Sequence, residues 1–448
     1  MKEHKDKLTL VSEQLTVSQP NQRDVPEHTS PSRSARQRPN NDDLLAWRVY
    51  WQEFGHPWRT EPEIEVERQH FLAERRRVTT DVKQGIYPFE GIALTRADVE
   101  WLLATHENGR EPVDWNDASQ RNRQGLDLRG GNLSQADLSY LPLARLCAGL
   151  DEVQWEQATK RQRQRAAVDM KGTNLQGAHL EGALLLKADL KDAFLMKAHM
   201  EGADLRGAYL EGANLQEARL DGASLCSAFF DEGTLLKNTS FGSKPTGFVS
   251  LDGLRWGHVN LGTVRWSQVE MVGEEQRARQ NLQDGKVKER ALRLGEYEEA
   301  VRATRQLAGL LQAQGLHEEA ARFTYRAQKL QRVVLRRQRK GGKYLFSGFL
   351  DLLAGYGYLP ERSLFWYVLI IVGFAFLYHA LGNLSFFPPD AFAYSLTSFH
   401  GRGFFPGLET KPSLHSPLVM LAAVEAVVGL FIEISFIATF TQRFFDTG

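Results

Sequence analysis

Apolar positions recur every five residues through the middle of this chain. From Thr173 to Leu235 every fifth residue is small, mostly alanine, and the residue two places later is Leu, Met or Phe, as in Ala188-Asp189-Leu190. This spacing fits neither the period of an α-helix nor the alternation of a flat strand. It predicts a square coil with one repeat on each side, in which the leucines fill a narrow axis and the alanines leave them room.

Weaker repeats extend this pattern in both directions. They begin near Leu126 and are interrupted near 145–170 by a charged stretch that is rich in helix formers. Beyond a Gly/Pro loop at 242–247 the repeats resume with larger residues, one residue out of phase, as in Val249-Ser250-Leu251. We therefore expect a solenoid over 123–271 with a helical insertion.

The repeated motif resembles that of the pentapeptide-repeat family. Ala203-Asp204-Leu205 and Ala213-Asn214-Leu215 carry its Ala-(Asp/Asn)-Leu pattern in full. The resemblance implies a right-handed quadrilateral β-helix. It implies no particular task, because one fold can serve many functions.

Two segments of different composition precede the solenoid. Residues 1–43 are rich in Ser, Gln, Asn, Pro and charge, which predicts a disordered tail. Residues 44–122 contain clustered aromatic side chains and a helix-start signal, Thr95 followed by Asp98. We expect a small helical cap there, because the end of a solenoid needs a cover.

After the solenoid the apolar period becomes helical. Amphipathic stretches open near Tyr297 and His317, with Gly315 between them as a stop signal, and predict a helical hairpin over 272–340. The hairpin resembles one tetratricopeptide unit. A single unit cannot bury its own apolar face, so we expect it to pack on the solenoid end or on a neighbouring subunit.

A basic run follows the hairpin and leads into an interfacial linker helix, 341–362. Its cations are Arg336, Arg337, Arg339, Lys340 and Lys343. Beside a membrane span such a run favours binding to anionic lipid headgroups, and nucleic acid is the less favoured alternative.

The C-terminal segment, 363–448, contains two strongly apolar stretches. They cover about 364–383 and 417–441 and are long enough to cross a bilayer. Buried core helices of a soluble domain are the alternative, but the basic run and the flanking Trp and Tyr residues favour membrane helices. Basic residues before the first stretch and Arg443 after the second predict that both termini lie on the cytoplasmic side.

The segment between the two stretches has the marks of a re-entrant loop. Pro388-Pro389-Asp390 starts a short apolar helix and 401–403 (Gly-Arg-Gly) ends it. The order of span, short helix, Gly-rich strip and second span resembles the two-transmembrane pore-loop module of potassium-channel-like proteins. Gly401 and Gly403 match the filter glycines of that family. The polar end of its pore helix is matched by Ser395, Thr397 and Ser398. The resemblance implies an all-α module with a re-entrant pore loop, assembled as a tetramer in a bacterial inner (plasma) membrane.

The filter sequence departs from the family pattern at three positions. His400 stands where Thr or Val is usual, Arg402 replaces the aromatic residue and Phe404 replaces the aspartate. A ring of arginines would repel K⁺, so we do not expect potassium selectivity. Arg402 pointing away to bind a glutamate, in a closed loop that conducts nothing, is the alternative. The filter candidates are Thr397, Ser398, His400, Gly401, Arg402 and Gly403.

The second apolar stretch carries two acidic residues. Glu425 and Glu433 share one broad helical face with Gly429 and Thr439. A carboxyl group inside a bilayer is costly and is by default a functional hypothesis. We expect these four residues to line a pore or gate. A purely structural pairing with Arg402 or a backbone group is the alternative.

Composition and motifs exclude several other classes. Lys plus Arg equals Asp plus Glu, 55 against 55, so the net charge gives no case for nucleic acid. The two cysteines form no metal or redox motif, and the sequence contains no phosphate-binding loop or nucleophile elbow. We expect no enzyme activity, no catalytic residue, no metal and no cofactor.

The sequence thus predicts an ion-channel-like membrane protein. It should form a homo-oligomer, a tetramer if it is a channel, and its cytoplasmic solenoid should dock a protein partner. A membrane-anchored scaffold without conductance is the alternative.

Overall fold

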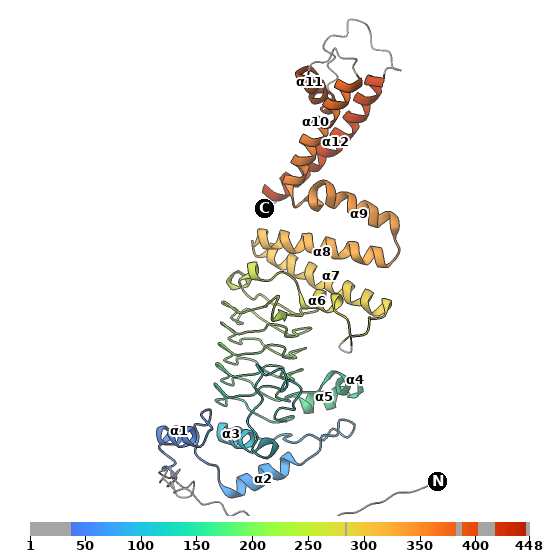
Figure 1. Ribbon diagram of the computed structural model, residues 1–448. Coiled ribbons are helices and arrows are strands. Elements are labelled where there is room, and N and C mark those ends of the chain that lie inside the picture. Colours follow the sequence, from blue (N-terminus) through green and yellow to red (C-terminus); the bar gives the residue numbers. More distant parts are fainter. Residues whose placement is uncertain (1–36, 283–284, 382–387, 402–416, 445–448) are drawn as a thin grey trace, which may run out of the picture.

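The computed structural model describes residues 37–282, 285–381, 388–401 and 417–444. Within these ranges the chain forms a long stack, with a helical cap at one end, the solenoid above it, and helices at the other end (Figure 1). Most of the predicted disordered tail, 1–43, lies outside the described residues.

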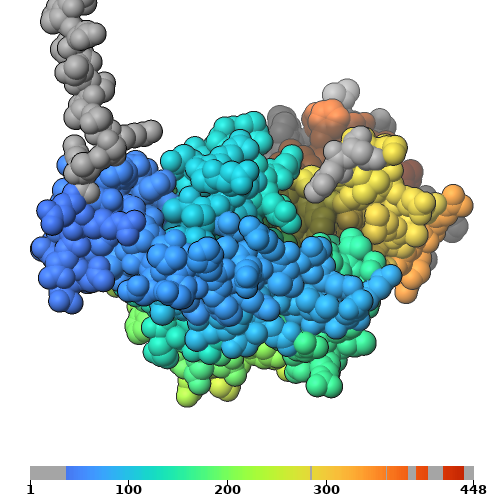
Figure 2. Space-filling view, turned by 90° about the horizontal axis from the view of Figure 1, so that it is seen from below, coloured from blue at the N-terminus to red at the C-terminus, as the bar shows by residue number. Residues whose placement is uncertain are grey.

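Three helices and one 3-10 turn form the cap. They are α1 (Leu44–Glu53), α2 (Val66–Arg76), α3 (Arg96–Ala104) and η1 (His106–Asn108). The helix start at Thr95 is a capping box, because the Thr95 side chain accepts from the Asp98 amide and Asp98 accepts from the Thr95 amide. Seen from this end, the blue cap spreads over the coils beneath it (Figure 2).

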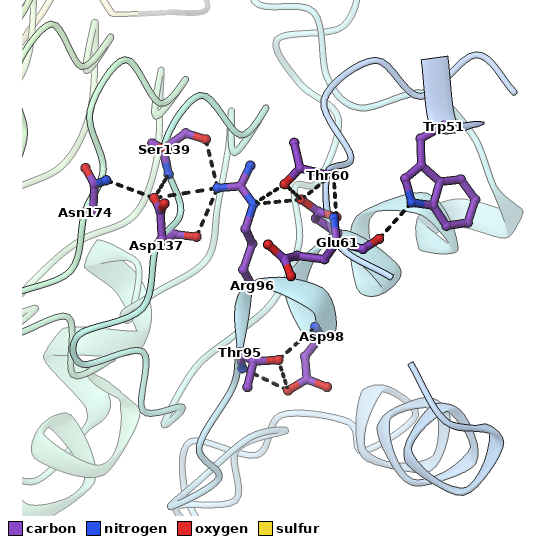
Figure 3. Close-up of polar contacts among 10 residues, drawn as sticks. Trp51, Thr60, Glu61, Thr95, Arg96, Asp98, Asp137, Ser139 and Asn174 are labelled. Atoms are coloured by element: carbon purple, nitrogen blue, oxygen red, sulfur yellow. Dashed lines mark hydrogen bonds and ion pairs between the residues drawn. The ribbon is translucent and has the colours of Figure 1, made fainter. Parts of the chain in front are cut away.

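Polar contacts of Arg96 join the cap to the solenoid. Arg96 pairs at 2.8 Å with Glu100, a fully buried carboxylate that also accepts from the Thr60 amide at 3.0 Å. The same guanidinium donates to the carbonyl oxygens of Asp137 and Ser139 at 3.1 and 3.2 Å (Figure 3). The cap is therefore fixed in orientation on the first coil.

Backbone pairing extends the solenoid into the segment assigned to the cap. Ala93 forms a parallel bridge with Asn132, and the Phe89 amide donates to the Arg129 carbonyl. The segment around 89–94 thus forms a side of the first coil, although it lacks the Ala-Asp-Leu pattern that would mark it in the sequence.

Parallel bridges between single residues hold successive coils together. The four bridges of one turn are Asp169↔Asp189, Asn174↔Phe194, His179↔His199 and Leu184↔Asp204. Each partner lies twenty positions along the chain and each side is five residues long, as the sequence predicts for a square coil. Regular strands are short: in the described part of the chain they are β1 (Gly242–Ser243) and β2 (Gly247–Phe248), an antiparallel pair.

The repeats fold this way because their apolar positions all point inward. Leu190, Leu195 and Leu205, with the alanines between them, have no exposed surface. Burying each leucine contributes about 1.5–3 kcal/mol. Each repeat turns at a residue with positive φ, which recurs at every fifth position from Gly172 to Ser227.

The register of the repeats changes at Asp231–Gly233, before the predicted slip at 242–247. Leu235 is 45% exposed, whereas Leu236 is buried in the axis, so the prediction that places Leu235 inside is wrong. One extra residue is accommodated there because the Asp231 carboxylate accepts from the amides of Gly212 and Gly233 at 2.8 and 3.0 Å. The β1–β2 hairpin then adds five residues, the length of one repeat. Ser250 therefore pairs with Ser224 in the same phase in which Ser240 pairs with Arg219.

Two other departures from the plain coil are helical. The insertion near 145–170 contains α4 (Glu152–Gln157) and α5 (Lys160–Ala166), each opened by a capping box. The last coil ends in two 3-10 turns, η2 (Leu261–Thr263) and η3 (Trp266–Gln268).

A helical hairpin closes the far end of the solenoid. It follows α6 (Gly273–Arg279) and consists of α7 (Arg290–Ala313) and α8 (His317–Arg337), so its first helix begins before Tyr297. Phe323 contacts Trp266 edge to face at 6.2 Å, and the Gln314 amide group donates to the Val259 carbonyl at 2.7 Å. Of the two expected placements, the hairpin therefore takes the solenoid end.

Glu274 in α6 completes this closure. Its side chain is fully buried and one carboxyl oxygen accepts from the Leu251 and Asp252 amides at 2.5 and 2.6 Å. Burial raises the pKa of Glu274, against the opposing effect of these amides.

The remaining helices form the C-terminal part of the stack. They are α9 (Gly341–Ala354), η4 (Gly355–Gly357), α10 (Pro360–Leu381), α11 (Pro388–Phe399) and α12 (Pro417–Phe444). α12 contacts α9 and η4, so the end of α12 returns to the start of α10 on the side of the bundle that faces the hairpin (Figure 1).

Candidate functional site

Helices α10 and α12 are long and apolar enough to span a membrane. In the most apolar 18-residue stretch of Glu361–Leu381 only 11% of the residues are buried, and in that of Pro417–Ile437 only 17%. Core helices of soluble proteins are mostly buried, whereas these two expose large apolar side chains. Examples are Phe365, Val368, Val372, Phe376, Met420, Val427, Phe431 and Ile437. Such surfaces suit contact with lipid or with other copies of the chain.

The short helix α11 packs between the two long helices and runs back along α10. In the middle of α11 the Tyr394 ring meets the Tyr378 ring edge to face, with centroids 4.6 Å apart, and at its end the Phe399 and Tyr367 ring centroids are 4.9 Å apart. The later residues of α11 thus contact the earlier residues of α10. The short helix therefore re-enters the bundle from the end that lies far from the solenoid.

Glu425 of α12 is fully buried at the centre of this bundle. One carboxyl oxygen accepts a hydrogen bond from the Tyr378 hydroxyl of α10 at 2.6 Å. The other lies 2.5 Å from the hydroxyl of Ser395 in α11, which is also 2.9 Å from the Ile371 carbonyl oxygen. A single carboxyl group thus connects all three helices.

The number of available protons indicates which protonation state of Glu425 fits the hydrogen bonds around it. A serine hydroxyl carries one proton, and Ser395 lies between two acceptors if Glu425 is ionised. If Glu425 is protonated, it donates to Ser395, and Ser395 in turn donates to Ile371. Tyr378 donates to the second carboxyl oxygen, and every group is paired. A neutral carboxyl group also avoids the cost of burying a charge among apolar helices.

Gly429 lets α11 approach α12 closely. It is buried, and a Cβ atom at this position would collide with the carbonyl oxygen of Phe399 at the end of α11. The sequence predicted Gly429 as a pore-lining residue. Within a single chain it lies where α12 packs against the end of α11.

His400 and Glu433 form a second polar contact near the end of α11. The Nδ1 atom of His400 pairs with the Glu433 carboxylate, and Nε2 lies 3.1 Å from the Tyr367 hydroxyl. Both side chains are about one third exposed. Glu433 therefore pairs with His400, whereas Arg402, the partner considered from the sequence, lies outside the described residues.

The other predicted filter residues are placed as follows. Ser398 is buried, and Thr397 donates to the carbonyl oxygens of its own helix, at 3.1 Å for Ala393 and 3.0 Å for Tyr394. Gly401 has a φ of 67° and its amide donates to the Ser398 carbonyl, which ends α11. Two further candidates, Arg402 and Gly403, lie outside the described residues, as does the side chain of Thr439.

Asp351 of α9 links the hairpin to the start of α10. Its carboxylate pairs with Arg332 of α8 at 2.7 Å and with Arg362 of α10 at 3.1 Å, and accepts from the Tyr325 hydroxyl at 3.0 Å. Burial acts to raise the pKa of Asp351, but the hydrogen bonds from Arg332 and Tyr325 hold it below its usual range. Nothing in the sequence distinguishes Asp351 from other acidic residues, because its partners come from two other helices.

The basic run and α9 form a continuous surface beside the bundle. Arg337 lies over the Tyr297 ring at 5.0 Å, and the other four predicted cations, Arg336, Arg339, Lys340 and Lys343, are exposed. The exposed apolar residues of α9 are Leu345, Phe346, Phe349, Leu350 and Leu352. Cations beside an exposed apolar helix face are typical of a helix that lies in a membrane interface.

Comparison with known families identifies the repeats. Residues 166–202 and 203–235 match the family model of pentapeptide repeats, in 8 copies. The resemblance seen in the sequence is confirmed over these residues, so this part of the chain consists of pentapeptide repeats, and the C-terminal part is helical. No curated protein sequence matches the chain.

Solved structures similar to this chain include other pentapeptide-repeat proteins. HetL of the cyanobacterium Nostoc sp. strain PCC 7120, involved in heterocyst differentiation regulation, is 25% identical over 29% of this chain and 66% of HetL, slightly less than two thirds, with a TM-score of 0.17. A thylakoid-lumen protein of Arabidopsis thaliana is 23% identical over 35% of this chain and 84% of its own, with a TM-score of 0.15. QnrB1, a plasmid-mediated fluoroquinolone resistance protein, is 17% identical over 32% of this chain and 75% of QnrB1, with a TM-score of 0.13.

Proposed function

We propose that this pentapeptide-repeat chain is an ion-channel-like protein of a bacterial inner membrane. In this proposal α10, α11 and α12 form a pore-loop module, and the solenoid is a cytoplasmic arm that docks a protein partner. The observation that carries the proposal is the course of α11, which packs against two apolar helices, runs back along α10 and ends at Phe399, shortly before the filter candidates Gly401, Arg402 and Gly403.

The position of Glu425 supports a pore between copies of the chain. Within one chain the three helices close around this carboxyl group, whose two oxygens are occupied by Tyr378 and Ser395. A conducting path would then run along an axis shared by several chains, and a tetramer is the assembly that the pore-loop resemblance implies. Rings of charged side chains select by charge, so Arg402 argues against potassium. Among the described residues, the acidic Glu433 pairs with His400, which stands two positions before Arg402 in the sequence.

The surface formed by α9 and the basic run supports a position of the arm against the membrane. Exposed apolar residues of α9 would enter the interface while the neighbouring arginines and lysines meet anionic headgroups. Asp351 would then transmit a movement of the hairpin to α10 through its ion pairs with Arg332 and Arg362.

Ion flux from liposomes tests the proposal. The purified full chain is reconstituted, and efflux of K⁺, Na⁺ and Cl⁻ is measured for wild type, Arg402→Ala and Glu433→Gln. Phe376→Leu, on the exposed face of α10, is the control. We expect flux that Arg402→Ala or Glu433→Gln changes at least several-fold and Phe376→Leu leaves unchanged, together with a tetramer in detergent. A monomer that passes no ion under any voltage contradicts the proposal.

A membrane-anchored scaffold without conductance is the second candidate. It is favoured by the closed packing around Glu425, because a bundle whose buried carboxyl group is paired within one chain can serve as an anchor alone. The same experiment separates the two candidates, since a scaffold requires neither a fourfold axis nor flux.

A further inference from the structure

A groove of about 900 Å³ runs along one side of the solenoid, away from the helical bundle. Its walls come from several coils and include Trp115, His179, Glu181, His199, Glu201 and Arg219. Neither the membrane module nor the docking of the helical hairpin uses these side chains.

Two successive coils present the same pair of side chains in this groove. His179 and His199 form a parallel bridge, and their rings stack with centroids 4.6 Å apart at 16°. Glu181 and Glu201 follow two residues later in each coil. The Nδ1 atom of His179 lies 2.9 Å from Glu181, and that of His199 lies 3.9 Å from Glu201.

The carboxylates of this cluster are incompletely satisfied. The Glu181 side chain is only 7% exposed, and its Oε2 atom has no hydrogen-bond partner; the Oε2 atom of Glu201 has none either. A buried acceptor without a donor is costly. Arg219 meets only the Oε1 atom of Glu201, at 2.9 Å, so a ligand able to satisfy the free oxygens must be a cation or a donor.

The donor atoms of three residues already converge. One ligand atom each from His179, Glu181 and His199 lies within 4.8 Å of the others. In a tetrahedral zinc site the bonds are about 2.0–2.2 Å, and the donors are roughly 3.3 Å apart. The two imidazoles are 47% and 31% exposed, so closing onto an ion would take a change of rotamer at side chains that are not packed on all sides.

We propose that His179, His199 and Glu181 bind a divalent transition metal ion of the zinc class, with Glu201 in reach as a fourth ligand. Two imidazoles and carboxylate oxygen suit Zn²⁺, Ni²⁺ or Cu²⁺ better than Mg²⁺ or Ca²⁺, which take oxygen ligands. The ion connects two neighbouring coils and adds a positive charge to the groove. The site was not expected from the sequence, because its ligands come from different coils.

Metal binding to the full chain without a histidine tag tests this inference. The protein in detergent is freed of metal with EDTA and titrated with Co²⁺, whose visible absorption reports tetrahedral coordination, and then with Zn²⁺ for stoichiometry. We expect one ion per chain and a more than tenfold weaker affinity in His179→Ala, His199→Ala and Glu181→Gln. His258→Ala removes an exposed histidine outside the cluster and should leave the affinity unchanged.

Two results would overturn the metal site. One is the absence of saturable Co²⁺ or Zn²⁺ binding up to millimolar concentration, and the other is equal binding by wild type and the double variant H179A/H199A. Circular dichroism of each variant confirms that the solenoid is folded, so that lost binding reflects lost ligands. The outcome is independent of ion flux, and neither result decides the channel proposal.

Discussion

A carboxyl group between apolar helices needs hydrogen-bond partners, and Glu425 finds them in both neighbouring helices. Tyr378 and Ser395 lie 2.6 and 2.5 Å from its two oxygens, and none of the three side chains has exposed surface. The proton count of this group favours a neutral carboxyl, which an amide can imitate. At the scale of single residues, polarity here specifies which helices pack together.

Replacing Glu425 by glutamine and by alanine should therefore have different effects. The Gln amide can accept from Tyr378 and donate to Ser395, so Glu425→Gln should change the unfolding midpoint in detergent by only a few degrees. Glu425→Ala leaves both hydroxyl groups unpaired beside a cavity, which costs about 2–4 kcal/mol. Thermal unfolding followed by circular dichroism compares them. Equal losses for both variants would show that an ionised carboxylate is required.

Gly429 permits a second prediction with a matched control. Gly429→Ala places a methyl group against the Phe399 carbonyl, so it should destabilise the bundle by about 1–3 kcal/mol. Gly373→Ala adds the same methyl group to α10, where a Cβ atom meets nothing within 4 Å, and should be neutral or slightly stabilising. The same thermal unfolding measures both. Similar stabilities would mean that α11 does not pack on Gly429.

At the scale of elements, Asp351 lies where the helical hairpin meets the apolar helix α10. Its ion pairs with Arg332 and Arg362 hold α8, α9 and α10 together, and its pKa lies below the usual value. A carboxyl group with a lowered folded-state pKa contributes stability above its unfolded pKa, about 3.9, and loses it as the pH falls through the folded value.

The variant Asp351→Asn should lose the stability that ionised Asp351 contributes at neutral pH. At pH 7 it should be less stable than wild type by about 1–3 kcal/mol, because two arginines lose their charged partner. Below about pH 4 the unfolded wild-type chain begins to bind a proton at Asp351, so the difference should start to shrink, and it should vanish only below the lowered folded-state pKa. Urea unfolding at pH 7, 5 and 3.5 gives the comparison. A difference that stays constant with pH would exclude an ionised Asp351 as its cause.

The elements themselves differ in how far the sequence predicts them. Repeats such as Ala203-Asp204-Leu205 and the capping box at Thr95 are local patterns, and both are found in the structure. The slip at Asp231 escaped prediction because Leu235 and Leu236 are both leucines, and only the contact of Asp231 with the neighbouring coil decides which one points inward.

The candidate sites show the same limit more strongly. Glu425 stands out in sequence because it is an acid among apolar residues, but its partner Tyr378 does not, because the two lie on different helices. The His179 and Glu181 cluster carried a readable signal, the repetition of His-x-Glu at His199 and Glu201 one coil later. That signal acquires meaning only once the coil length of twenty residues is applied to polar as well as apolar positions.

At the scale of the whole molecule, the start of α10 and the end of α12 lie on the same side of the helical bundle, the side that faces the solenoid. α10 starts beside α9, and α12 returns to contact α9 and η4, so both long helices meet the helices that follow the solenoid. The start of α11 lies at the opposite end (Figure 1). In a membrane this arrangement places the solenoid on one side and the segment that begins α11 on the other.

Single added cysteines test this topology in bacterial spheroplasts. Asp390→Cys, exposed near the start of α11, should react with a membrane-impermeant maleimide in intact spheroplasts. Lys197→Cys on the solenoid should react only after the spheroplasts are permeabilised. The native thiols should contribute little background, because burial raises the pKa of Cys147 and Cys226 to about 11 and keeps both protonated at neutral pH. Wild-type chain provides that background. Equal labelling of Asp390→Cys and Lys197→Cys in intact spheroplasts would place both on one side, and α10 and α12 would then be helices that do not cross the membrane.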